Sequence, residues 1–153
     1  MKFLFKLSLF TPLLLPLFLV VIFAAALAGN PSSNISNGTT FGRQTTLTAK
    51  EVAQKASISE ERAEDVIKIL NFQLSKEGFT LAGSSGSLAV ADRESGFDPK
   101  AINPSGGVAG YFQWSGWSNT INGNRWSKAS RRTLDSDIQL QLMSTELNGD
   151  YKN

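Results

Sequence analysis

An uncharged apolar stretch near the N-terminus constrains the fold more than any other feature of this sequence. It runs from Leu7 to Ala28, and as a helix it is long enough to cross a hydrocarbon core of about 30 Å. Lys2 and Lys6 precede it, and the next cation is Arg43. Because positive charges favour the cytoplasmic side, we expect the N-terminus to stay in the cytoplasm and everything after residue 30 to be exported.

The apolar stretch has three interpretations. It is either retained as a transmembrane anchor or removed as a signal peptide after the small-x-small triplet Ala26-Leu27-Ala28. A buried helix of a soluble protein is the third, but no later segment is apolar enough to cover it. We therefore predict a signal peptide or anchor over residues 1–29, a flexible Ser/Thr/Asn/Gly-rich linker over 30–47 and a folded domain over 48–153. The domain is expected outside the membrane, either anchored or secreted.

Missing residue types narrow the chemistry of the exported domain. The sequence has no Cys and no His, which excludes disulfides, thiolate metal sites, a Cys nucleophile and the usual general base. Without Lys2 and Lys6, the 15 Lys and Arg become equal in number to the 13 Asp and Glu. The domain thus lacks the basic footprint of a nucleic-acid binder. We expect no metal and no cofactor.

Capping signals and apolar spacing predict a long first helix. Thr48–Glu51 and Ser57–Glu60 both fit a capping box. The second precedes a helix predicted over Glu60–Glu77, with Gly78 as its stop. One face of this helix is apolar, which favours a role in the core: Ala63, Val66, Ile67, Leu70 and Leu74.

Two further helices complete a domain that we predict to be mainly α. One begins at Ser84 or Ser85 and ends at Ser95, and Gly96 terminates it. A Gly/Pro/Asn-rich stretch over 96–123 is predicted to be loop. The last helix is predicted over Leu134–Leu147, capped by Thr133 and stopped by Gly149.

An acid at a helix end opens the segment that we expect to carry chemistry. Glu94 lies near the C-terminus of the second helix, where the helix dipole disfavours a carboxylate. The turn-rich stretch that follows ends in a glycine-flanked segment and Gln113. Such a stretch lets the backbone approach a ligand closely, with an acid at one side and an amide at the other.

The ordered pattern of this segment resembles a known catalytic signature. Glu-Ser-Gly-Phe-Asp-Pro, then Ala-x-Asn-Pro-x-Gly, then Gly-x-x-Gln-Trp is similar to the signature of the lysozyme-like and lytic transglycosylase superfamily. The closer resemblance is to the phage tail-tip lysozyme family. It covers roughly residues 58–148, and segments 74–80 and 146–149 are also similar. The resemblance implies a lysozyme-like helical domain.

The resemblance implies that Glu94 is the catalytic acid. It would protonate the glycosidic oxygen between N-acetylmuramic acid and N-acetylglucosamine in peptidoglycan glycan strands. Such an acid must stay protonated near neutral pH, and burial against apolar side chains would achieve this. The expected wall is Phe97, Tyr111, Phe112 and Trp114.

Other residues of the segment are expected to bind substrate. Ser95 would hold Glu94 by a hydrogen bond, and Gln113 would contact the reacting sugar. The aromatic residues Tyr111, Trp114 and Trp117, together with Trp126, suit sugar rings, although core packing explains the three tryptophans equally well or better.

The second step of the reaction has alternatives. A two-carboxylate hydrolase needs a partner acid. Asp98 precedes a proline and so suggests a turn, and Asp135 and Asp137 fit a helix first turn. A lytic transglycosylase needs no partner, because a hydroxyl of the muramic acid attacks internally and leaves a 1,6-anhydro sugar.

One departure from the family pattern qualifies the functional expectation. Related domains continue past the Glu-Leu-Asn-Gly segment with further helices, whereas only residues 150–153 follow it here. We therefore expect an incomplete copy of the domain. The leading hypothesis is a peptidoglycan-cleaving muramidase or lytic transglycosylase at the cell wall, serving a phage, a conjugative apparatus or the cell itself. The alternatives are a non-catalytic peptidoglycan-binding module and an inactive remnant.

Overall fold

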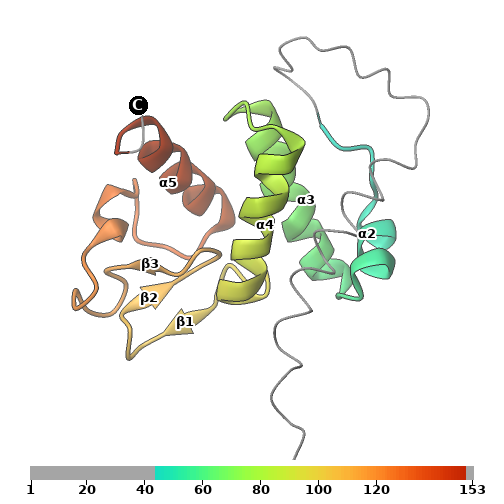
Figure 1. The fold of residues 1–153 in the computed structure, drawn as a ribbon. Helices are drawn as coiled ribbons and strands as arrows, with labels where there is room; N and C mark the ends of the chain where they lie inside the picture. The colour runs from blue at the N-terminus through green and yellow to red at the C-terminus, as the bar shows by residue number, and fades with distance from the viewer. Residues whose placement is uncertain (1–43, 151–153) are drawn as a thin grey trace, which may run out of the picture.

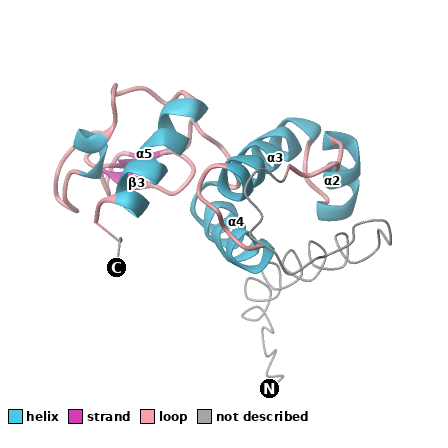
Figure 2. Ribbon diagram, turned by 90° about the horizontal axis from the view of Figure 1, so that it is seen from above, coloured by secondary structure: helices cyan, strands magenta, loops and turns pink. Residues whose placement is uncertain are grey.

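The computed structural model describes residues 44–150, and the fold is mainly helical, as predicted. Helices α2, α3 and α4 lie together on one side, and a small three-stranded sheet lies with α5 on the other (Figures 1 and 2). The predicted signal peptide or anchor and residues 30–43 of the predicted linker lie outside the described residues. Within the described residues, no helix is long and apolar enough to cross a membrane. The incompleteness of the domain stays a prediction.

Helix α2 spans Ala49–Ala56 and begins with the predicted capping box. The Thr48 hydroxyl accepts from the Glu51 amide at 3.3 Å, and the Glu51 carboxylate accepts from the Thr48 amide at 2.8 Å. The second predicted box is wrong. Ser57 instead ends α2 in a left-handed conformation, with φ +56°, and Ser59 caps the next helix.

Helix α3 spans Glu60–Ser75 and carries the predicted apolar face into the core. Ala63, Val66 and Leu70 are buried, while Ile67 and Leu74 are partly buried against the same core. The helix ends two residues before the predicted Glu77. The reversal that follows uses Gly78 at φ +66°, a conformation that costs glycine little.

Helix α4 spans Leu81–Ser95 and begins earlier than predicted, because Thr80 rather than Ser84 or Ser85 is the cap. The Thr80 hydroxyl accepts from the Gly83 amide at 3.1 Å. Leu88 and Ala91 are buried in the core. Gly96 ends the helix at φ +60°, also as predicted.

The stretch predicted as loop holds three short antiparallel strands in the order β1-β2-β3. They are Ile102–Asn103, Val108–Ala109 and Trp114–Ser115. Val108 pairs with both Asn103 and Ser115, so β2 is central. Two-residue strands are too short to show the alternation by which a strand is recognised in a sequence.

Helix α5 spans Ser136–Asn148 and closes the sheet side of the molecule. Its cap is Asp135, whose carboxylate accepts from the amides of Asp137 at 2.9 Å and Ile138 at 3.1 Å, so the predicted Thr133 cap is wrong. Gly149 ends the helix as predicted. Leu140, Leu142 and Met143 join the core cluster that runs through α2, α3, α4 and the sheet.

Candidate functional site

Glu94 lies in the last turn of α4, and its side chain is exposed. The predicted burial of this carboxyl against an apolar wall is therefore wrong for this structure. Glu94 follows Ser87 and Val90 at spacings of seven and four, so the three side chains project from one face of α4. This face turns toward α5 and the sheet, because both Ser87 and Val90 line the pocket there.

The chain leaves α4 through two consecutive left-handed residues. Gly96 has φ +60° and Phe97 has φ +62°. Complete burial of the Phe97 ring in the core offsets the energetic cost of this rare conformation. The Arg62 guanidinium donates to the Phe97 carbonyl at 3.4 Å. Phe97 thus anchors the reversal rather than forming a wall around Glu94.

Ser95 ties the end of α4 to the segment that holds Gln113. Its hydroxyl lies 2.9 Å from the Tyr111 carbonyl and 3.0 Å from the Ala91 carbonyl. The predicted bond from Ser95 to Glu94 is not the one formed. Ser95 instead fixes the glycine-flanked turn beside the helix end that carries the acid.

Tyr111 is held by all three long helices. Its carbonyl accepts from Ser95 of α4, its amide donates to the Gln139 side chain of α5 at 2.8 Å, and its hydroxyl donates to Asp65 of α3. The ring is completely buried, so it offers no surface to a sugar and acts in the core. Burial and the neighbouring Asp65 carboxylate raise the pKa of Tyr111, and burial also raises the pKa of Asp65.

Gln113 follows at φ +47°, a left-handed position where glutamine is rare. Its Nε2 donates to the carbonyls of Gly110 at 3.0 Å and Ala101 at 3.1 Å. Both N–H groups of the amide therefore brace the loop. No described residue donates a hydrogen bond to its Oε1, and the side chain is half-buried.

Trp114 is buried and bonded to a residue that the sequence analysis did not single out. Its indole Nε1 donates to Glu146 of α5 at 2.9 Å. Arg125 adds a two-pronged ion pair to the same carboxylate, with Nε at 2.7 Å from Oε1. Burial alone would raise the pKa of Glu146, but the bonds from Arg125 and Trp114 and the charges of Arg125 and Lys128 outweigh it and lower that pKa. The sequence carried one sign of this role, because Glu146 lies on the same face of α5 as the apolar residues Leu142 and Met143.

The tryptophans form one aromatic cluster with Phe112. The Trp114 ring meets the Phe112 ring edge-on, with ring centroids 5.2 Å apart, and meets the Trp126 ring edge-on at 6.2 Å. The centroids of the Trp117 and Trp126 rings are 4.9 Å apart. Trp126 is buried, which confirms a core role. Trp117 is half-buried under the Arg132 guanidinium, 5.4 Å from its ring. Of the three tryptophans, Trp117 is therefore the one that is partly exposed.

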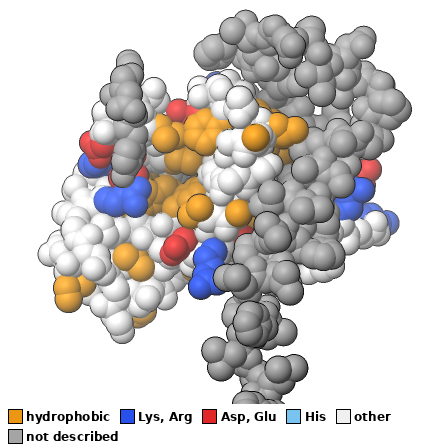
Figure 3. Space-filling view, in the orientation of Figure 1, with side chains coloured by type: hydrophobic (Ala, Val, Ile, Leu, Met, Phe, Trp, Pro, Cys, Tyr) orange, Lys and Arg blue, Asp and Glu red, His pale blue; other side chains and the backbone are white. Residues whose placement is uncertain are grey.

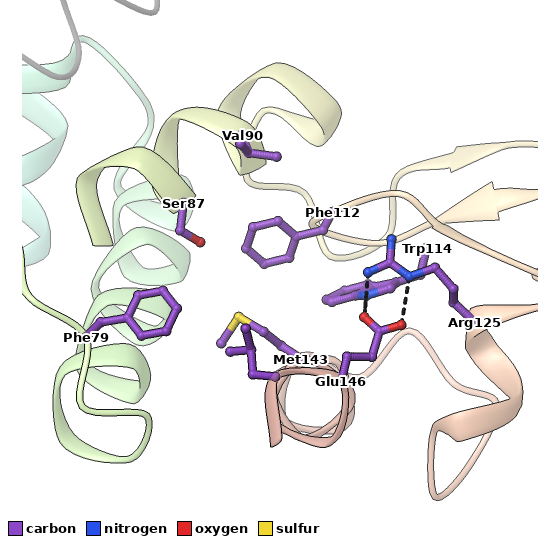
Figure 4. Close-up of a pocket in the computed structure, with 9 residues that line it drawn as sticks. Phe79, Ser87, Val90, Phe112, Trp114, Arg125, Met143 and Glu146 are labelled. Carbon is purple, nitrogen blue, oxygen red and sulfur yellow. Dashed lines mark hydrogen bonds and ion pairs between the residues drawn. The ribbon is translucent and has the colours of Figure 1, made fainter. Parts of the chain in front are cut away.

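A pocket of about 250 Å³ opens between α4, α5 and the aromatic cluster (Figure 4). Its lining is mostly apolar and comprises Phe79, Ser87, Val90, Phe112, Trp114, Arg125, Met143, Glu146 and Leu147. Figure 3 shows hydrophobic side chains gathered on this face between α4 and α5. The ion pair of Arg125 and Glu146 forms its polar edge.

The candidate partner acids all have structural contacts. Asp98 accepts from the Lys100 amide at 2.8 Å and pairs with Arg62 at 2.9 Å, which confirms its turn role. Asp135 caps α5, and Asp137 pairs with Lys68 at 2.8 Å. Between residues 44 and 150, no group of three or more acidic, Cys or His residues could hold a metal ion.

Comparison with known protein families identifies the family of this chain. A family model described as phage tail lysozyme matches residues 61–153, a range that includes Glu94, the turn with Gln113 and Glu146. No curated protein and no solved structure matches the chain. The family match covers well over half of the sequence. This protein therefore belongs to the phage tail lysozyme family.

Proposed function

We propose that this protein cleaves peptidoglycan at the bond between N-acetylmuramic acid and N-acetylglucosamine, with Glu94 as the general acid. Membership of the phage tail lysozyme family supports a peptidoglycan-cleaving, lysozyme-type function in general. The observation that carries the finer proposal is the placement of Glu94. It lies in the last turn of α4, directly before Ser95, whose hydroxyl lies 2.9 Å from the Tyr111 carbonyl and so holds the turn of Gln113 at this helix end.

The chemistry requires Glu94 to be neutral when it meets the glycan. Its side chain is exposed in the free protein, so the substrate itself must supply the apolar cover. A glycan strand lying over the end of α4 excludes water, and this favours the protonated carboxyl. Glu94 then gives its proton to the glycosidic oxygen as the bond from that oxygen to the sugar carbon breaks.

Gln113 and Trp117 are the proposed sugar contacts. Both N–H groups of the Gln113 amide already brace the loop, so its Oε1 is the atom left to accept from a sugar hydroxyl or amide. Trp117, which is partly exposed, is proposed to pack on a pyranose ring. Ser95, Tyr111 and Trp114 contribute as positioning residues, because their polar groups bond to the protein.

The acceptor of the glycosyl group decides the class of enzyme. Asp98 and Asp135 are occupied by a turn and a cap, which favours internal attack by the muramyl hydroxyl and an anhydro product. Attack by water would give a reducing end instead. Mass spectrometry of the released fragments separates the two, since the anhydro product is lighter by one water.

The test is release of soluble fragments from purified cell wall by the full chain. We expect Glu94→Gln to lower the release rate by at least 100-fold, because general acid catalysis contributes factors of about 10² to 10⁴. Glu64→Gln, which removes an exposed carboxylate from α3, is the matched control and should leave the rate unchanged. Equal release by wild type and Glu94→Gln would remove Glu94 from the role.

A non-catalytic peptidoglycan-binding module is the second candidate, and the exposure of Glu94 is the observation that favours it. This function predicts that the full chain pellets with insoluble wall and releases neither reducing ends nor anhydro sugars. Either function places the domain outside the membrane, where peptidoglycan lies. Lys2 and Lys6 ahead of the apolar stretch 7–28 support that location.

A further inference from the structure

The stretch of residues 99–134, which contains the three strands, has five cations and no acid. The cations are Lys100, Arg125, Lys128, Arg131 and Arg132. Arg125 and Lys128 are neutralised, because they pair with Glu146 and Asp150 at the C-terminal end of α5. Arg131 and Arg132 are adjacent in the chain, so uncompensated positive charge concentrates at their position.

Both arginines are exposed and lie in the bend that precedes α5. No described carboxylate forms an ion pair with either of them. The nearest acid in the sequence, Asp135, instead accepts from two backbone amides at the start of α5. Since two adjacent cations repel each other, a bound anion relieves this repulsion. The pair is therefore a candidate site for an anionic group.

Arg132 is held in place by an aromatic ring. Its guanidinium lies over the Trp117 ring, with Cζ 5.4 Å from the ring centroid, at the distance of a cation–π contact. Among the described residues, none of its N–H groups has an acceptor. A guanidinium presents these groups as a planar fork that binds a carboxylate or a phosphate through two hydrogen bonds. The fork is thus positioned for an anion beside Trp117.

The kind of anion follows from the proposed function, on which this step rests, because that function places a pyranose on Trp117. A sugar there lies within reach of the Arg132 guanidinium. N-acetylglucosamine is neutral, whereas N-acetylmuramic acid carries a peptide with free carboxylates on its lactyl group. We propose that Arg131 and Arg132 bind a carboxylate of this peptide. The pair thus makes the protein prefer glycan that still carries its peptides.

Calorimetric titration of the full chain carrying Glu94→Gln tests the proposal without turnover. One ligand is a tetrasaccharide of alternating N-acetylglucosamine and N-acetylmuramic acid with its peptides attached. The matched ligand is the same molecule with the peptide carboxylates converted to carboxamides. We expect the carboxylate form to bind at least about fivefold more tightly, because charge-assisted bonds to arginine are stronger than neutral ones. Equal binding of the two ligands would overturn the proposal.

Removal of the arginines tests the location. Arg131→Gln combined with Arg132→Gln should abolish the preference for the carboxylate form, while the affinity for the carboxamide form changes less than about twofold. Arg131→Gln alone leaves the contact between Arg132 and Trp117 in place and should reduce the preference. If the arginines only supported Trp117, their loss would weaken the binding of both ligands equally, and this result would overturn the assignment.

A pair of lysines on α2 provides the matched control. Lys50 and Lys55 are exposed, and neither pairs with a described carboxylate. Lys50→Gln combined with Lys55→Gln removes the same charge as the double arginine variant and should leave the preference unchanged. An equal loss of preference in the two double variants would show a general effect of net charge and would overturn the assignment.

Phosphate-bearing polymers of the wall are the competing source of an anion. Short chains of poly(glycerol phosphate) are titrated into the same variants. Tighter binding of these chains than of the peptide-bearing tetrasaccharide, lost together with the arginines, would identify a phosphate polymer as the ligand and overturn the proposal.

These measurements separate the peptide contact from the proposed catalysis. If Glu94→Gln still releases wall fragments, the acid assignment fails while the binding preference stands. If release depends on Glu94 but the preference survives the loss of both arginines, only the peptide contact fails.

Discussion

At the scale of single residues, the candidate site depends on side chains that bind the protein rather than the substrate. Gln139 is the clearest case. Its Oε1 accepts from Tyr111, and its Nε2 donates to the carbonyls of Pro99 at 2.9 Å and Leu134 at 3.0 Å. It is fully buried, so its three bonds satisfy nearly all of its capacity. Such residues fix the loop that presents Gln113.

Ser95 allows a direct measurement of this kind of support. Ser95→Ala removes the bond to the Tyr111 carbonyl, and we expect the free energy of unfolding to fall by about 1 kcal/mol. The rate of wall-fragment release should fall as well, because the Gln113 turn loses its tether to α4. Denaturant titration and the release assay measure the two effects.

Ser85→Ala is the control for this prediction. Ser85 makes the same bond to the carbonyl four residues earlier, at 2.9 Å, but makes no bond outside its helix. We expect its removal to change stability by less than about 0.5 kcal/mol. A loss as large as that in Ser95→Ala would refute the idea that the Tyr111 contact matters.

At the scale of elements, the turn between β2 and β3 is fixed by close approach of the backbone to α5. Gly110 has φ +86°, and a Cβ there would lie 2.3 Å from the Gln139 Oε1. Only glycine fits, because any larger residue would push Gln139 away from the Tyr111 amide. The close packing of the turn against α5 therefore depends on glycine at position 110.

Gly110→Ala should therefore lower the free energy of unfolding by about 2 kcal/mol or more. Gly86→Ala should do the reverse. Nothing lies within 4 Å of a Cβ at Gly86, and alanine in a helix interior is worth about 0.5–1 kcal/mol over glycine. Thermal unfolding of the two variants measures both signs, and a stabilised Gly110→Ala would contradict the packing described.

The elements show where sequence reasoning succeeds. The capping box at Thr48, the apolar face of α3 and the stop at Gly96 rest on contacts close in sequence, and all three are confirmed. The wrong predictions are of two kinds. The first kind is the choice between two neighbouring residues that can both cap a helix. Ser57 and Thr133 were predicted as caps, but Ser59 and Asp135, each two residues later, are the caps in the structure, and the sequence alone does not distinguish the members of each pair.

The second kind of failure depends on tertiary contacts. The burial of Trp114 beside Glu146, and the pairing of Arg125 with that acid, join residues far apart in the chain. The exposure of Glu94 likewise depends on how closely the loop covers the end of α4. No periodicity or spacing reports such distances. The order of the motif thus indicates which residues meet, but not which of them are buried.

At the scale of the whole molecule, the pair of Glu146 and Arg125 makes stability depend on pH. The pKa of Glu146 is lower in the folded protein than its ordinary value of 4.5. The ionised form is thus favoured by folding, so its contribution is present above about pH 4.5 and is lost as the pH falls through the lower folded value.

Glu146→Gln should therefore be less stable than wild type at pH 7, by about 2 kcal/mol, and the difference should shrink below pH 4.5. Urea unfolding between pH 7 and pH 3 measures this. Glu64→Gln carries the same change of charge on an exposed position and should show almost no difference at any pH. A constant gap between Glu146→Gln and wild type would contradict the assignment.

The attachment of Tyr111 to α3, α4 and α5 has a consequence for how the protein loses its function when it unfolds. A chain in which any one of these helices has detached also loses the geometry around Gln113. We therefore expect partly unfolded forms to be inactive on glycan. Activity under heat or denaturant should be lost together with the cooperative unfolding of the domain and not before it.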